Sequence, residues 1–102
     1  PVSAMRRNIQ QIIDSVRARR PEVRILLAQM EAPPNLGAAY TSEFRETFPA
    51  LARENDLALL PFLLDGVAGV RAMNQGDGIH PNPVGSRVVA ENVWRGLRAV
   101  LR

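Results

Sequence analysis

The run Arg-Ile-Leu-Leu-Ala-Gln-Met at positions 24–30 decides the fold class of this chain. It is short, it is apolar on both alternating faces, and it follows a helical pattern after only a few residues. Such a run is typical of a strand buried inside a parallel sheet. Residues 57–62 form a second run of the same character, which ends at Pro61 or soon after it. The sequence therefore predicts two buried strands.

Amphipathic helical patterns precede, separate and follow these runs, within residues 5–16, 40–51 and 84–100. Pro21 predicts that the first helix ends near residue 19 or 20, because proline disfavours helical dihedrals in its predecessor. Pro49 lies inside the second pattern and is expected to kink or split that helix. The predicted inward stripes of the first and last helices are Met5, Ile9, Ile12, Ile13 and Val16, and Val84, Val88, Val89, Val93, Leu97 and Val100.

Capping residues refine the helix boundaries. Ser3 is the expected N-cap of the first helix, and Asn82 followed by Pro83 is the expected start of the last. Trp94, inside the last helix, is expected to pack between that helix and the sheet. The order helix, strand, helix, strand, helix with short connections predicts an α/β fold with parallel strands. Strands this apolar need neighbours, so we expect the missing strands on a segment N-terminal to Pro1.

Composition excludes several classes of function. The chain has 102 residues, 46% hydrophobic content and a net charge of +3, which predict one small globular domain. All 13 basic residues are arginine, and their densest cluster, at residues 17–24, has no aromatic neighbour. That cluster predicts a solvated helix end and no nucleic-acid site. Cysteine is absent, and no apolar run approaches the roughly 18 residues of a membrane span.

Asp77-Gly-Ile-His-Pro-Asn82 is the stretch that carries chemistry. His80 is the only histidine, and Asp77 stands three residues before it. An aspartate at that distance can accept a hydrogen bond from Nδ1 and leave Nε2 free to act as a general base. The segment also follows the second strand, at the sheet edge where ligand sites form. Taken alone, the motif is weak and more often marks a surface histidine beside a capping aspartate.

Several segments in succession resemble the SGNH (GDSL-type) hydrolases, in particular their bacterial arylesterase, thioesterase and lysophospholipase branch. The resemblance extends from about Ile9 to Leu97. It is carried by Met30–Gly37, Tyr40-Thr41, Phe44, Phe48–Ala52, Leu59–Phe62 and Asp77–Asn82.

The resemblance implies a three-layer α/β fold with a flavodoxin-like, five-stranded parallel sheet, of which this chain supplies the last two strands and three helices. It assigns Asp77 and His80 as the catalytic orienter and base. The family's serine nucleophile and its glycine and asparagine oxyanion blocks are not in the sequence, and Pro1 falls just after the asparagine block. Residues 1–102 are therefore expected to be the C-terminal part of one domain, with the N-terminal segment as the required partner.

None of the chain's own serines replaces that nucleophile, because none lies in a strand-to-helix turn with a following glycine. They are Ser3, Ser15, Ser42 and Ser86. Glu31 near a strand end has no second carboxylate beside it and predicts no glycosidase. One histidine without cysteine gives no zinc signature, so no metal or cofactor is expected.

The resemblance implies small acyl or aryl esters as substrates, with thioesters or lysophospholipids also open. Met73, Ile79, Pro34 and Leu36 could line an apolar pocket, and ordinary loop packing fits them equally. By analogy we expect a bacterial periplasmic or secreted location, with a cytoplasmic one open. The rival interpretation is a non-catalytic α/β module, stand-alone or swapped, that serves in binding or assembly.

Overall fold

Alternating helices and parallel strands build the chain, as shown by a computed structural model that describes residues 1–101. The elements in order are α1 (Val2–Arg19), β1 (Leu26–Ala28), α2 (Ala38–Asn55), β2 (Ala58–Leu60) and α3 (Pro83–Val100). Short 3₁₀ turns η1 (Pro34–Leu36) and η2 (Arg71–Met73) lie in the connections after β1 and after β2. The predicted α/β class is therefore confirmed.

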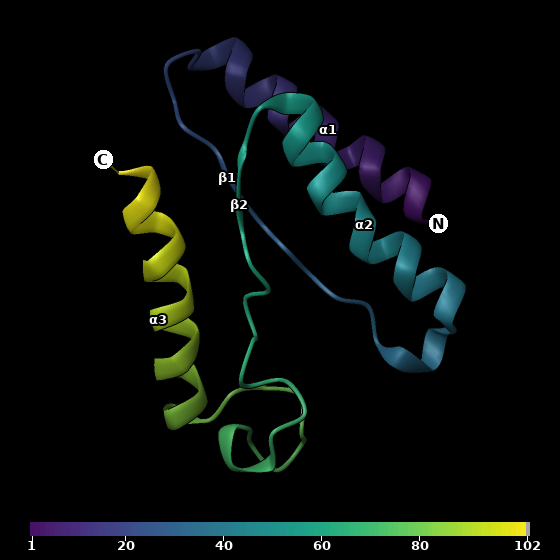
Figure 1. The fold of residues 1–102 in the computed structure, drawn as a ribbon, viewed down its shortest axis with the longest axis vertical. Helices are drawn as coiled ribbons and strands as arrows, with labels where there is room; N and C mark the ends of the chain where they lie inside the picture. The colour runs from purple at the N-terminus through teal and green to yellow at the C-terminus, as the bar shows by residue number, and fades with distance from the viewer. Residues whose placement is uncertain (102) are drawn as a thin grey trace.

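β1 and β2 pair in parallel, with Leu26 opposite Ala58 and Ala28 opposite Leu60. The Gln29 amide extends the ladder by donating to the Leu60 carbonyl at 2.8 Å. Helices lie on both sides of the strands, with α3 on one side and α2 and α1 on the other (Figure 1). α2 and α3 each contact both strands, whereas α1 packs on α2.

The strands are less buried than their sequence predicts. β1 is half-buried throughout, and in β2 Ala58 is exposed while only Leu60 is fully buried. Within the described residues the sheet consists of this one pair, so each strand keeps an edge without a strand neighbour. Apolar strands of this kind normally have neighbours and helices on both faces.

The helix boundaries largely follow the predicted signals. α1 ends at Arg19, just before Pro21, and the Asn82 side chain caps α3 by accepting from the Gly85 amide at 2.9 Å. The prediction for Ser3 is wrong, because α1 begins at Val2 and Pro1 occupies the cap position. α2 continues through Pro49 without a break, so the expected split does not occur.

Two predicted core faces need correction. Ile12 of the α1 stripe is 63% exposed, whereas its neighbour Ile13 is buried. In α3, Val84 is exposed and Trp94 is 52% exposed, so Trp94 does not pack between helix and sheet.

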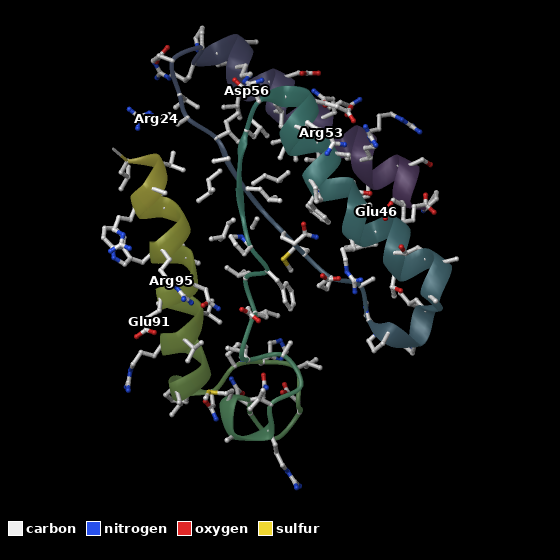
Figure 2. The ribbon with its side chains drawn as sticks, in the orientation of Figure 1. Arg24, Glu46, Arg53, Asp56, Glu91 and Arg95 are labelled. Carbon is white, nitrogen blue, oxygen red and sulfur yellow. The ribbon has the colours of Figure 1, made fainter. Side chains whose placement is uncertain are left out.

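Small residues explain how α3 is rotated. Gly85 and Asn92 are its buried positions, and a Cβ on Gly96 would lie 2.2 Å from Leu60 Cδ1. The helix therefore turns its glycine-bearing side to the sheet. Trp94, two residues from Gly96 and about 160° away around the helix, points outward. Figure 2 likewise shows Glu91 on the flank of α3 remote from the strands.

Candidate functional site

The connection between β2 and α3 forms the candidate site. It leaves the carboxyl end of β2, passes through η2, and returns to α3 as a compact loop below the strands (Figure 1). An antiparallel bridge between Asn74 and Pro81 closes the loop at its base. Asp77 and His80 lie between these two positions, at the edge of the sheet where α/β folds place ligand sites.

Asp77 and His80 form a hydrogen-bonded pair. His80 Nδ1 lies 2.6 Å from Asp77 Oδ2. The other carboxylate oxygen, Oδ1, accepts from the backbone amides of Ile79 and His80, each at 3.1 Å. Gly78, at φ 74°, provides the left-handed turn that folds the carboxylate back over these amides. The four-residue segment therefore positions its own aspartate against its own histidine.

The electrostatics of the pair fix the proton on one ring nitrogen. The hydrogen bond from the His80 side chain, together with those from the His80 and Ile79 amides, lowers the pKa of Asp77 from 3.8 to about 2. The carboxylate is therefore ionised near neutral pH and can only accept, so Nδ1 donates the proton. The neutral imidazole then keeps its lone pair on Nε2, as a general base requires.

The imidazole is open to solvent. The side chains of His80 and Asp77 are 67% and 43% exposed. Within residues 1–101, Nε2 makes no hydrogen bond, and no serine hydroxyl bonds to the pair. Among these residues the arrangement thus pairs an imidazole with a carboxylate that orients it, and no hydroxyl group bonds to the imidazole.

All four serines lie in helices, and Ser3 lies inside α1 instead of at the predicted cap position. Ser3 and Ser15 lie on α1, Ser42 on α2 and Ser86 on α3, and all are exposed. A helix interior does not project a serine as a strand-to-helix elbow does.

The predicted pocket residues lie at the same edge of the molecule, in two separate segments. Met73 ends η2 and is half-buried, and Ile79 is 71% exposed at the tip of the loop. Pro34 and Leu36 form η1 on the connection after β1, with Leu36 51% exposed. A cavity of about 500 Å³ adjoins the loop, but Gly69–Arg71 and Asn74–Gly76 line it together with Gly78. The pocket assignment stays a prediction.

Two asparagines in the loop matter more than the sequence pattern indicated. Asn74 Nδ2 donates to the carbonyls of Val67 and Val70 at 2.8 and 2.7 Å. Asn82, predicted only as a helix cap, also donates to the Ala72 and Asn74 carbonyls. An Asn before a Pro is a visible cap signal, whereas nothing local marks the distant carbonyls that accept from its side chain.

Two other features that would indicate a function, a cluster of metal ligands and a membrane-spanning helix, do not occur within the described residues. Within residues 1–101, no three histidine or acidic side chains gather as metal ligands would. No helix in that range combines the length and the apolar content that crossing a bilayer requires.

Known proteins resemble this chain in sequence and in structure. Residues 1–88 match the GDSL-like Lipase/Acylhydrolase family. The chain is similar to the esterase TesA of Pseudomonas aeruginosa, with 40% identity over 85 residues, and to thioesterase 1/protease 1/lysophospholipase L1 of Escherichia coli, with 36% identity over 93 residues. The first match covers 83% of this chain and 42% of that protein, and the second covers 91% and 44%.

A solved structure gives the same relationship. The crystal structure of TesA superimposes with a TM-score of 0.85 and 34% identity, over 97% of this chain and 54% of that one. The chain therefore spans about half the length of the relatives it matches. From the match to the family and the identity to its esterases, we conclude that this chain belongs to the GDSL-like lipase/acylhydrolase family.

Proposed function

We propose that this chain is the C-terminal part of a serine ester hydrolase, in which His80 is the general base and Asp77 its orienter. The observation that supports it best is the 2.6 Å bond between Asp77 Oδ2 and His80 Nδ1, in a loop that leaves Nε2 facing solvent. The nucleophilic serine and the oxyanion donors would come from the N-terminal segment of the complete polypeptide.

The proposed reaction proceeds by acyl transfer. His80 Nε2 takes the proton of the serine hydroxyl as its oxygen attacks the ester carbonyl carbon, and then gives that proton to the departing alcohol. Water then attacks the acyl-enzyme while His80 takes its proton and returns it to the serine oxygen. This step releases the acid and frees the serine. Asp77 remains ionised throughout and stabilises the imidazolium that forms at each proton transfer. The proposed residues perform this chemistry without a cofactor or metal.

The proposed substrates are small acyl or aryl esters. The names of the similar proteins, an esterase and a thioesterase/lysophospholipase, support acyl transfer and leave thioesters and lysophospholipids as members of the same class. Met73, Ile79, Pro34 and Leu36 are proposed to contribute an apolar wall for the acyl or aryl group. We further propose a periplasmic or secreted location, which fractionation of cells that express the complete polypeptide would test.

The shape of the chain supports a second segment in the same domain. Its radius of gyration is 15.1 Å, and its extents are 42 × 35 × 18 Å. A compact domain of this length has a radius of gyration of about 13 Å. A flat slab with open strand edges is what half of a three-layer domain would look like.

Substitution of the pair tests the proposal. In the complete hydrolase, His80→Ala and Asp77→Asn are expected to lower kcat for a p-nitrophenyl ester by about 10²- to 10⁴-fold. Asp65→Asn is the matched control. Asp65 is exposed on the same connection, and its backbone carbonyl, which accepts from Asn92, is kept. It should retain the parental rate.

A serine-directed fluorophosphonate completes the experiment. It should label the N-terminal segment of the parental enzyme and react more slowly with the His80→Ala variant, because the serine then lacks its base. Hydrolysis that survives His80→Ala, or a complete absence of labelling in the parental enzyme, would contradict the proposal. Absence of both labelling and hydrolysis would favour the non-catalytic module.

A further inference from the structure

Asp77 fixes the imidazole relative to its own loop, but nothing in that pair fixes the loop relative to the rest of the molecule. Both side chains are exposed, and within residues 1–101 the carboxylate bonds only to residues 79 and 80. A general base must meet its nucleophile within hydrogen-bond reach, so the placement of the whole loop matters as much as the pair itself.

The base of the loop is held by backbone hydrogen bonds. The Gln75 amide donates to the His80 carbonyl at 2.8 Å, and the Asn82 amide donates to the Met73 carbonyl at 2.9 Å. These bonds lie on either side of the antiparallel bridge between Asn74 and Pro81. They join the two arms of the loop to each other, but they do not join the loop to α3.

The Asn82 side chain joins this hairpin to α3 and η2 at once. Its Oδ1 accepts from the Gly85 amide at 2.9 Å, in the first turn of α3. Its Nδ2 donates to the Ala72 carbonyl at 2.7 Å and to the Asn74 carbonyl at 3.3 Å. Both protons of Nδ2 are therefore used, and three segments meet at one half-buried amide. We call these three side-chain bonds the Asn82 latch.

Close packing makes the latch stiff. A Cβ on Gly85 would lie only 2.0 Å from the Met73 carbonyl oxygen, so α3 starts in direct contact with the end of η2. Pro81, with its fixed φ, is the single residue between His80 and Asn82. A displacement of Asn82 is therefore passed to His80 through a short and rigid connection.

We infer that Asn82 is a positioning residue for His80, holding the base where the serine of the complete enzyme can reach it. The inference rests on the proposed function. Under this inference, Asp77 and Asn82 have different roles. Asp77 sets the tautomer of the imidazole, and Asn82 sets its location.

Asn82→Asp and Asn82→Ser in the complete hydrolase separate the latch from the helix cap. Asp and Ser cap helices about as well as Asn, so both keep the bond from the Gly85 amide. Asp offers no proton to the Ala72 and Asn74 carbonyls, and Ser is too short to replace both donors. Asn8→Asp is the control for the chemical change, because Asn8 is an exposed asparagine on α1.

Both variants are expected to lower kcat about 10- to 100-fold with KM within about twofold, because misplacement of a base affects the transition state. Hydrogen exchange at the Gln75 amide, which donates to the His80 carbonyl, should accelerate in both Asn82 variants and not in Asn8→Asp.

Parental kcat in both Asn82 variants would overturn the inference, and so would Gln75 exchange at the parental rate, whatever the activity. Loss of activity in His80→Ala combined with full activity in Asn82→Asp would defeat only the positioning role. Hydrolysis that survives His80→Ala would instead defeat the proposed function, and with it any part that Asn82 plays in that reaction.

Discussion

At the scale of single residues, Asp77 uses its two carboxylate oxygens for different purposes. Oδ2 binds the imidazole, and Oδ1 accepts the two amides that follow it in the chain. The second set of bonds holds the first in place, because the carboxylate cannot rotate away without giving up the amides. The pair therefore forms these bonds without burial, and its side chains stay open to solvent.

The lowered pKa of Asp77 predicts how the loop responds to acid. The folded pKa of about 2 is below the ordinary value of 3.8, so ionised Asp77 stabilises the folded loop. That contribution is fully present above pH 3.8 and is lost as the pH falls through about 2. The amide chemical shifts of Ile79 and His80, followed by NMR, should therefore change with a midpoint near 2.

Asp77→Asn should remove this transition from the same amides. A midpoint near 3.8 in the parental protein would show that the carboxylate does not hold the amides in solution.

At the scale of elements, α2 shows how a helix tolerates an internal proline. Pro49 has no amide proton, so the Arg45 carbonyl one turn earlier loses its helical donor. Gln29, buried at the end of β1, supplies a replacement, because its Nε2 donates to that carbonyl at 3.0 Å. Arg45 also pairs with Glu31 through its side chain. Gln29, the residue after β1, thus satisfies the carbonyl that proline leaves open.

A double-mutant cycle tests this compensation. Gln29→Leu should lower the free energy of unfolding by about 1–3 kcal/mol, because it leaves the Arg45 carbonyl without a donor. In a Pro49→Ala background the same change should cost less, since the alanine restores a backbone amide that can bond to the Arg45 carbonyl in the helical pattern. The bond from Gln29 to the Met30 carbonyl is lost in both backgrounds and cancels. Urea denaturation of the four proteins measures the coupling.

Equal losses in the two backgrounds would mean that the bond to Arg45 does not stabilise α2. Asn35→Leu, an exposed amide in η1, is a suitable control for the change from amide to leucine.

At the scale of the whole molecule, the chain exposes more surface than a compact protein of its size. Its accessible surface is 7145 Å². A compact monomer of the same mass exposes about 5,700 Å². A groove of about 610 Å³ runs between α3 and the amino-terminal half of the strands, lined by apolar residues such as Leu26, Leu59 and Val100. This open surface supports the proposal that a further segment belongs to the same domain.

Separate production of the two segments tests this prediction. The present chain alone should not hydrolyse a p-nitrophenyl ester and should bind a hydrophobic dye. Adding the N-terminal segment should raise the temperature of unfolding, reduce dye binding and restore hydrolysis, because association buries the open sheet edge. A chain with His80→Ala should associate equally well and remain inactive.

If the present chain alone hydrolysed the ester and this activity depended on His80, the result would contradict the proposal that the nucleophile lies on the N-terminal segment. An unfolding temperature that the added segment leaves unchanged would contradict the shared domain.

The sequence by itself determined the features that depend on neighbouring residues. The Asp77–His80 bond follows from a spacing of three residues around a glycine. The last residue of α1 follows from Pro21, and the start of α3 follows from Asn82 with Pro83. The alternation of helices and strands was sufficient for the α/β class. Each of these is encoded within a few residues of where it acts, so a linear pattern can show it.

Only the tertiary structure decided which side of each element faces inward and which distant groups meet. α3 rotates so that Gly85 and Gly96 approach their neighbours closely, and this turns Trp94 outward although its hydrophobicity predicts the core. Gln29 meets the carbonyl freed by Pro49, and Asn82 meets Ala72, across gaps in sequence that no periodicity spans. Close packing and the need to satisfy every buried polar group select these pairings, and both act only once the chain has folded.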